Sequence, residues 1–368
     1  MKIAMLSLAD PWAHAHGGTL RTRGFLQAFT ELGHDVVCVF PSRLPATKPG
    51  SGRSVAVATA PIGMHPLLGS VRRAKRLLLP MPTAIGARSR ALADAVIAER
   101  PDVVAVSTLA QAAYADAVPT ARLWLDMSDL WSEFARREAM TRRGVARRLA
   151  LLQQRQIERT ETARVAAAAF VTAAGYTDAA ILTERAGTSV SWLPTPLQVH
   201  PVPLPEPLPK CAGFIANFAF GPNADAWQVL ATSWLPRLRE RGWDVVVAGL
   251  GSDLLPALPG VVRLGPVDDV AEFYREISVT LAPIRLGGGM KVKVAESLLA
   301  GRPVIASRFA VDGFPPAIRA LTHVVDLDDP DLDGLDEIAS VVPPAAELSV
   351  FGTDHFWNEV SRLLNGLG

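Results

Sequence analysis

The stretch Ala282–Phe309 carries the pattern that decides the fold of the second half of the chain: A-P-I-R-L-G-G-G-M-K-V-K-V-A-E-S-L-L-A-G-R-P-V-I-A-S-R-F. An apolar run leads into three consecutive glycines, an amphipathic segment follows, and a Gly-Arg-Pro break precedes a second apolar run. This order indicates a strand, a tight glycine turn, a helix and another strand. The sequence therefore predicts a β-α-β unit here.

The three glycines predict a turn that binds an anion. Gly287, Gly288 and Gly289 have no Cβ atom, so the backbone can turn sharply and approach a ligand closely. Their amides, with that of Met290, would stand at the start of the helix. Unpaired N–H groups and the positive end of the helix dipole at that position suit a phosphate.

The helix after the glycines adds a cation and a carboxylate. At about 100° per residue, one broad sector is apolar. Lys293 and Glu296 are neighbours on the opposite side, whereas Lys291 is expected to face solvent. A lysine can neutralise a diphosphate, and a carboxylate one turn later can accept hydrogen bonds from vicinal hydroxyls. A nucleoside diphosphate presents both groups; the alternative is a surface Lys–Glu pair on an ordinary β-α-β unit.

The segment G-G-G-M-K-V-K-V-A-E-S-L-L-A-G-R-P-V-I-A-S is similar to the donor-binding signature of retaining, family-4-type glycosyltransferases of the GT-B fold, in the glycine-rich subgroup. The resemblance implies an α/β protein of two facing Rossmann-like domains with a deep interdomain cleft. It also implies that Lys293 contacts the donor diphosphate and that Glu296 contacts the ribose hydroxyls. Many members carry an earlier glutamate where this chain has Gly288, so a carboxylate contact to the donor sugar has no counterpart here.

Length and composition are consistent with this organisation. The chain has 368 residues, which suits two domains, and 49% of them are hydrophobic, enough for large cores. We predict an acceptor-binding domain over residues 1–193, a proline-rich linker over 194–209 and a donor-binding domain over 210–351. By the same resemblance, a terminal helix within 352–368 packs back on the first domain.

The net charge and the cysteine content limit which partners and which cellular compartment can be expected. The formal net charge of +1 gives no reason to expect a nucleic-acid partner. Cys38 and Cys211 lie far apart without metal or disulfide spacing, which favours a reducing, cytoplasmic compartment. The basic, leucine-containing segment 71–82 is expected to be an exposed helix. The alternative is a peripheral membrane contact for an anionic or lipid-linked acceptor.

A Gly-Gly turn precedes the first predicted helix, between strands over 2–9 and 35–40. In the family that resembles this chain, the matching loop faces the donor phosphates and the acceptor. We therefore expect Gly18 to contact the donor, Arg21 to act in catalysis, and His14 and His16 to contact the acceptor. The alternative for each histidine is a solvated loop side chain.

A second acidic segment, Leu125–Arg136, begins at the carboxyl end of a predicted strand, where open α/β sheets bind ligands. Its spacing resembles an Asp-x-x-Asp segment of the family, although Ser128 stands where many members have histidine. We expect Asp126 to contact the acceptor and Asp129 to act in catalysis. The alternative for both residues is a role as helix N-cap, and this alternative is stronger for Asp126 than for Asp129.

The second domain opens with a strand from Cys211 and a loop that resembles a family motif. Asn217 and Asn223 of this loop are expected to contact the donor. The basic residues that grip the diphosphate from this loop in other members are absent, so binding would depend on Lys293 and the glycine amides. Arg285 is expected to reach the phosphates, or else to pair with Asp268.

The segment from Leu264 to Val267 matches the edge that cradles the nucleobase in the family, so both residues are expected to contact the donor.

Together these features predict a metal-independent, retaining transfer of a sugar from a nucleoside-diphosphate sugar, UDP-sugar above others, to a hydroxyl. The acceptor would be a small molecule, a glycan or a lipid-linked molecule, and no cofactor is expected. The leaving diphosphate can itself take the acceptor proton. The acidic run Asp328–Asp331 lies in a loop-like region and is not expected to bind a metal. A nucleotide-sugar epimerase and a non-catalytic nucleotide-sugar-binding protein are the alternatives.

Overall fold

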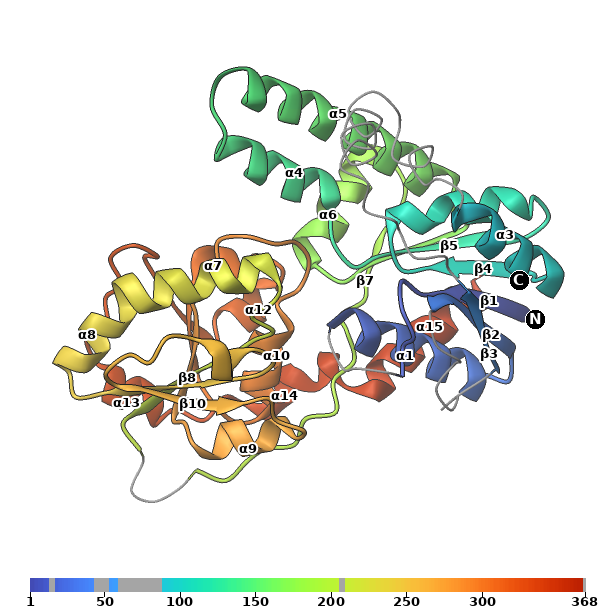
Figure 1. Cartoon of the computed structure of the whole chain (residues 1–368). Helices are drawn as coiled ribbons and strands as arrows, with labels where there is room; N and C mark the ends of the chain where they lie inside the picture. Colours follow the sequence, from blue (N-terminus) through green and yellow to red (C-terminus); the bar gives the residue numbers. More distant parts are fainter. Residues whose placement is uncertain (13–16, 43–52, 59–87, 205–208, 367–368) are drawn as a thin grey trace. The chain divides into compact units, whose positions relative to one another are not determined.

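The computed structural model describes residues 1–12, 17–42, 53–58, 88–204 and 209–366 (Figure 1). The chain divides into two compact units, one of residues 1–196 with 353–368 and the other of residues 197–352. Each unit is a parallel sheet whose strands alternate with helices along the chain. This architecture confirms the predicted α/β class with two Rossmann-like domains. No helix among the described residues is long and apolar enough to span a membrane.

The first unit is built on a parallel sheet with the strand order β3-β2-β1-β4-β5-β6-β7. The described strands are β1 (Lys2–Leu6), β2 (Asp35–Ser42), β3 (Arg53–Ala58), β4 (Val103–Val106), β5 (Arg122–Met127), β6 (Phe170–Ala173) and β7 (Ser191–Trp192). The described α-helices are α1 (Gly17–Glu31), α3 (Arg88–Glu99), α4 (Trp131–Met140), α5 (Gly144–Ala167), α6 (Tyr176–Ala186) and α15 (Thr353–Asn365).

Helix α15 belongs to the first unit because its apolar face packs on α1. The ring of Phe356 lies 4.9 Å from that of Phe25, which in turn lies 5.6 Å from Trp124 of β5. Phe29 contacts the same tryptophan at 5.4 Å. These rings join the last helix, the first helix and the sheet into one core cluster. β4 and β5 are almost continuously apolar and buried, as strands covered on both faces are.

The second unit has the strand order β10-β9-β8-β11-β12-β13, again parallel. Its described strands are β8 (Cys211–Ile215), β9 (Asp244–Ala248), β10 (Val261–Gly265), β11 (Val279–Ala282), β12 (Val304–Ser307) and β13 (Thr322–Val325). Its described α-helices are α7 (Gly221–Val229), α8 (Leu235–Glu240), α9 (Val270–Arg275), α10 (Val292–Leu299), α11 (Arg308–Val311), α12 (Pro316–Arg319), α13 (Leu335–Ala339) and α14 (Ala345–Leu348).

Most of the segment predicted as a linker is built into the second unit. The Leu197 amide donates to the carbonyl of Phe351, and the Val202 amide donates to that of Ala300. Arg302 is fully buried and has no acidic partner in its hydrogen-bond set. Its guanidinium instead donates to the backbone carbonyls of Val202, Pro203, Tyr274, Ile277 and Ala300. The chain therefore becomes part of the second unit from Leu197 onward, before the predicted boundary.

Candidate functional site

The candidate site lies where the strand order of the second sheet changes direction. Strand β8 is the first strand of the unit, and its neighbours are β9 on one side and β11 on the other. Ligands of open α/β sheets bind at the carboxyl ends of the strands at such a point. The two segments that leave this edge are residues 216–220 after β8 and residues 283–291 after β11.

The glycine turn after β11 has the backbone that only glycine adopts readily. Gly287 has φ of 117° and Gly289 has φ of 59°. Helix α10 begins at Val292 with Lys291 as its N-cap, so the glycines precede the cap and do not form the first helical turn. The turn stands directly before a helix N-terminus, as an anion-binding turn would.

Lys291 does not face solvent as predicted. Its side chain is partly buried, and its ammonium donates to the carbonyl oxygens of Gly288 at 2.5 Å and Gly289 at 3.2 Å. The same ammonium lies 4.8 Å from the ring centroid of Phe309. The sequence pattern placed Lys291 by helical rotation, but it lies at the cap, where its side chain folds back on the turn. Lys291 therefore fixes the glycine backbone.

Gly313 also shapes this turn, although no sequence motif pointed to it. A Cβ atom at position 313 would lie 2.7 Å from the carbonyl oxygen of Gly289 and 3.1 Å from the Cα of Met290. Because real Cβ atoms essentially never come within 3.0 Å of such an atom, a side chain here would displace the turn. The contact joins residues of different segments of the chain. It could therefore be seen only once the fold had brought the two segments together.

Lys293 and Glu296 of α10 form the charged part of the site. The Lys293 ammonium lies 4.3 Å from the ring centroid of Phe214 in β8 and donates to the Asn223 side-chain oxygen at 3.2 Å. Burial lowers the pKa of Lys293 to about 7, although the negative charge of Glu296 opposes the shift. Burial likewise raises the pKa of Glu296 to about 7, opposed by Lys293. A new negative charge beside Lys293 would therefore favour its protonated form.

The loop after β8 connects to this lysine through Asn223. The Asn223 side-chain amide donates to the Asn217 carbonyl at 2.9 Å, while its oxygen accepts from Lys293. The Asn217 side-chain oxygen accepts from the Ala219 amide at 3.0 Å and shapes the same loop. The structure thus brings three predicted donor contacts together: Asn217, Asn223 and Lys293.

Arg285 pairs with a residue that the sequence analysis did not single out. Its guanidinium donates two hydrogen bonds, each of 2.9 Å, to the carboxylate of Asp225 in α7, and not to Asp268. This pair ties the segment after β11 to the helix after β8. The Arg285 side chain is 49% exposed. Phosphate contact by Arg285 therefore requires that it share or leave Asp225.

The two predicted nucleobase contacts lie on and just after the edge strand β10. Leu264 is 37% exposed on β10. Val267 is partly buried and packs against the apolar cluster that contains Val246 and Phe273. A planar base could cover the surface that these two residues form. Their contact with a base stays a prediction.

In the first unit, Arg21 and Asp126, for which catalytic and acceptor-binding roles were predicted, pair with each other in the core. Both side chains are 1% exposed, and two hydrogen bonds of 2.6 Å join the guanidinium to the carboxylate. Arg21 also donates to the Leu193 carbonyl, and Asp126 accepts from the Thr172 hydroxyl. Their donors and acceptors are used within the core, so we assign this pair to the fold and not to a substrate.

The other predicted site residues of the first unit lie in loops, at the start of α1 or outside the described residues. Gly18 is exposed in the first turn of α1, and Asp129 is exposed between β5 and α4. The Ser128 hydroxyl beside Asp129 donates to the Ser107 carbonyl and steadies that loop. His14, His16 and the segment 71–82 lie outside the described residues.

Within the described part of the chain, no group of three or more His, Cys, Asp or Glu side chains could hold a metal ion. The acidic run near residue 328 is organised by other contacts: the amides of Asp328 and Asp329 donate to the Asp326 carboxylate. Asp329 also pairs with Arg237 of α8.

Part of the chain and its overall fold are similar to known proteins. Residues 209–331 match the family described as glycosyl transferases group 1, and no curated protein matches the sequence. The fold is similar to that of a sucrose-phosphate synthase from Thermosynechococcus elongatus, with 14% identity, a TM-score of 0.73, and coverage of 100% of this chain and 99% of that one.

Two further solved structures share the fold over nearly their whole length. Anabaena HepE in complex with UDP and glucose has 10% identity, a TM-score of 0.61 and full coverage of both chains. A glycosyltransferase from Rickettsia africae has 11% identity, a TM-score of 0.59, and coverage of 98% and 97%. The family match over the second unit and the fold of the whole chain support a glycosyltransferase of the GT-B fold.

Proposed function

We propose that the protein transfers a sugar from a UDP-sugar to a hydroxyl acceptor, with retention of anomeric configuration and without a metal ion. The observation that carries the proposal is the desolvated Lys293, held by Phe214 and Asn223 behind the glycine turn at the switch point of the second sheet. The structural neighbour Anabaena HepE is solved in complex with UDP-glucose, which supports UDP as the nucleotide.

Each group in the second unit has a role in this reaction. Lys293 and the amides around Gly287–Met290 would bind the diphosphate, whose negative charge grows as the bond to the sugar breaks. A preorganised cation in a poorly hydrated position stabilises that charge more than water does. Glu296 would accept hydrogen bonds from the ribose hydroxyls, and the departing diphosphate would take the acceptor proton. Asp129, exposed after β5, is the proposed contact from the first unit.

Nucleotide binding gives the first test. Excess ligand stabilises the folded protein by RT ln(1 + [L]/Kd), so UDP, GDP and ADP can be ranked by the rise in melting temperature. We expect UDP to give the largest rise. Glu296→Ala should weaken UDP binding by about 2–3 kcal/mol, because a charged hydrogen-bonding partner is lost. Glu240→Ala, an exposed glutamate of α8, is the control. Equal UDP affinity in all three proteins would refute the ribose contact.

Turnover of labelled UDP-sugars without acceptor gives the second test. A transferase should release sugar by slow hydrolysis, and the anomer first formed, seen by NMR, should keep the donor configuration. Activity should persist in excess EDTA. Loss of activity on chelation, restored by Mg²⁺ or Mn²⁺, would refute metal independence. An epimerised donor would identify an epimerase, and bound but unchanged donor a binding protein.

A further inference from the structure

Helix α5 carries apolar residues on two opposite faces. Its buried residues are Ala150, Gln154, Ile157, Glu161 and Val165, and they pack toward the first unit. Val145, Leu149 and Leu152 follow the spacing i, i+4, i+7 and form one stripe roughly opposite that buried face. Ordinary surface helices are polar on the face away from the core. The outer stripe is therefore not explained by the packing of this unit.

The outer stripe is well exposed and belongs to the tip of a helical hairpin. Val145 is 72% exposed, Leu152 is 59% exposed and Leu149 is 44% exposed. All residues from 141 to 149, where α4 turns into α5, are exposed. Met140, the last residue of α4, is 56% exposed at the same turn. Apolar side chains thus gather at the end of the hairpin that projects from the sheet (Figure 1).

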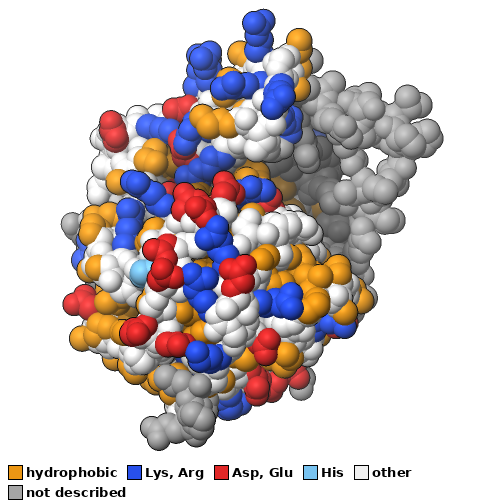
Figure 2. Space-filling model, turned by 90° about the vertical axis from the view of Figure 1, so that its left-hand side faces the viewer, with side chains coloured by type: hydrophobic (Ala, Val, Ile, Leu, Met, Phe, Trp, Pro, Cys, Tyr) orange, Lys and Arg blue, Asp and Glu red, His pale blue; other side chains and the backbone are white. Residues whose placement is uncertain are grey.

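The charges around the stripe have one sign. Between residues 139 and 157 the sequence has arginines at 142, 143, 147, 148 and 155 and no Asp or Glu. Arg148 and Arg155 flank the stripe on one side, given about 100° of rotation per residue. Figure 2 shows blue basic side chains among orange hydrophobic ones at the upper end of the molecule, the end where Figure 1 draws this hairpin.

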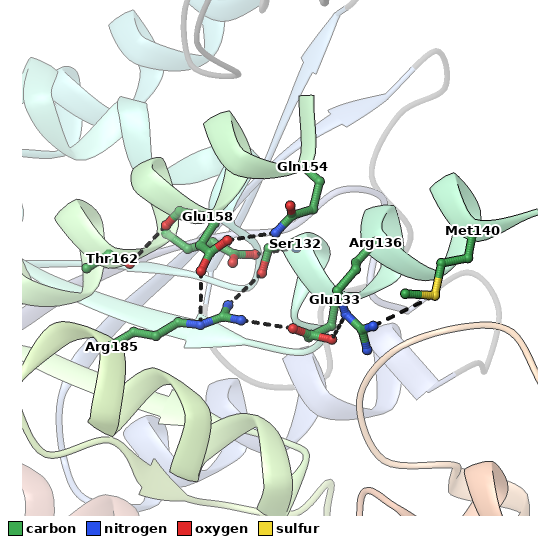
Figure 3. Close-up of polar contacts among 9 residues, drawn as sticks. Ser132, Glu133, Arg136, Met140, Gln154, Glu158, Thr162 and Arg185 are labelled. Atoms are coloured by element: carbon green, nitrogen blue, oxygen red, sulfur yellow. Dashed lines mark hydrogen bonds and ion pairs between the residues drawn. The ribbon is translucent and has the colours of Figure 1, made fainter. Parts of the chain in front are cut away.

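Hydrogen bonds and ion pairs hold the base of the hairpin to helix α6 (Figure 3). The tip therefore projects from a well-fixed base. Arg185 of α6 donates to the Glu133 carboxylate and the Ser132 hydroxyl, both of α4. It also pairs with Glu158 of α5 at 3.3 Å. The buried Glu161 of α5 accepts from the Ser132 amide at 3.0 Å. Glu133, Glu158 and Glu161 are thus engaged near the base of the hairpin, whereas arginines 142, 143, 147 and 148 lie at the turn between α4 and α5, with Glu138 in the last turn of α4.

We propose that the α4–α5 hairpin docks the protein on an anionic lipid surface. Val145, Leu149 and Leu152 would enter the interface between headgroups and acyl chains, and the arginines would contact the anionic headgroups, as in interfacial amphipathic helices. A second copy of the chain fits poorly, because stripe against stripe would bring the two sets of arginines together. The proposal does not depend on the reaction proposed above.

Vesicle cosedimentation tests the proposal with the full-length protein. The probes are vesicles of phosphatidylcholine alone and vesicles of phosphatidylcholine and phosphatidylglycerol in equal parts. The stripe variant is Val145→Ser/Leu149→Ser/Leu152→Ser, and the charge variant is Arg148→Gln/Arg155→Gln. The matched controls replace exposed residues elsewhere in the same numbers: Ile97→Ser/Val341→Ser/Val342→Ser and Arg122→Gln/Arg239→Gln. Circular dichroism and melting temperature check that each variant folds.

We expect the wild type and both controls to bind the anionic vesicles at least about tenfold more tightly than the neutral ones. The stripe variant should lose about tenfold or more of this affinity. The charge variant should lose about twenty-fivefold at low salt, at about fivefold for each of its two arginines near the surface, and its binding should depend less on salt. Equal binding by the stripe variant and its control, or no binding of the wild type, would overturn the proposal. So would a change of oligomeric state in the stripe variant by light scattering without a change in vesicle binding.

Discussion

Two combinations of a cation and a carboxylate, the fully buried Arg21 and Asp126 of the first unit and the partly buried Lys293 and Glu296 of the second, differ in what surrounds them. Arg21 and Asp126 of the first unit satisfy each other with two hydrogen bonds, and a carbonyl and a hydroxyl complete the set. Lys293 of the second unit has an asparagine oxygen and an aromatic face instead, with the charge of Glu296 nearby.

The difference shows how a structural pair can be told from a candidate site. The Arg21–Asp126 pair is closed, so a ligand would have to break strong hydrogen bonds in the core to reach it. Burial shifts the pKa values of Lys293 and Glu296 toward each other, because their surroundings do not fully replace water. An incoming diphosphate and ribose would supply the missing partners. Perturbed titration of this kind is more typical of functional sites.

The largest effect should come from opening the closed pair. Asp126→Ala leaves a buried guanidinium without its carboxylate, so the free energy of unfolding should fall by about 3–5 kcal/mol in urea denaturation. The matched control is Asp225→Ala, which breaks the bidentate but half-exposed pair with Arg285 and should lower it by only about 0–1 kcal/mol. Similar losses from both substitutions would mean that burial does not distinguish these pairs.

The next effect concerns the pair of the second unit. Lys293→Ala should lower turnover about a hundredfold, because the charge of the leaving diphosphate grows in the transition state. Stability should stay the same or rise, because a poorly hydrated charge is removed. Turnover with a UDP-sugar and urea denaturation measure the two quantities. A destabilised variant with normal turnover would make Lys293 a structural residue like Arg21.

Lys291→Ala should have a smaller effect, and on a different quantity. The variant loses the hydrogen bonds that hold the Gly288 and Gly289 carbonyls, so the anion-binding turn becomes less ordered. We expect UDP affinity to fall about tenfold, equivalent to about one hydrogen bond to a charged group, with little change in turnover at saturating donor. Calorimetric titration and saturation kinetics separate the two. A loss of turnover equal to that of Lys293→Ala would place both lysines at the leaving group.

The smallest effect should be a pH dependence of nucleotide binding. With a pKa of about 7, Lys293 loses its proton as the pH rises from 7 to 8. The diphosphate prefers the protonated form of Lys293, so loss of this proton alone lowers affinity about fivefold over the interval; ionisation of Glu296, whose pKa is also about 7, opposes part of that fall. Titrations of UDP at both pH values measure it, and Lys293→Met should remove most of the slope. An affinity that rises with pH in the wild type would contradict the sign of this linkage.

Much of the fold was predictable because parallel strands covered on both faces are short continuous apolar runs. The glycine turn, α10 and the Gly-Arg-Pro break follow from local backbone chemistry, and the structure places them close to the predicted residues. Lys293 and Asn223 could also be proposed, since each follows the carboxyl end of a strand. Hydrophobic period and turn chemistry are properties of neighbouring residues, and sequence patterns report those well.

The misplaced residues depend on contacts between distant segments. Arg21 and Asp126 are 105 positions apart, so the pattern around each could not reveal that they satisfy each other in the core. Asp225 and Gly313 also act on the site through partners that are not sequence neighbours, Arg285 at 60 positions and Gly289 at 24. Lys291 was misjudged because helical rotation was applied to a cap residue, whose side chain does not follow the helix surface.

The buried Arg302 also decides where the second unit can be cut for recombination between related enzymes. Its guanidinium uses the Val202 and Pro203 carbonyls, which precede the family match at residue 209. A chimera joined at residue 209 would take that segment from another protein, and the N–H groups of Arg302 would be left unsatisfied, at about 1–3 kcal/mol for each, wherever the new backbone follows a different path. A graft that begins at Leu197 carries the partners of Arg302 with it, so modular exchange should follow the hydrogen bonds of this arginine and not the sequence match.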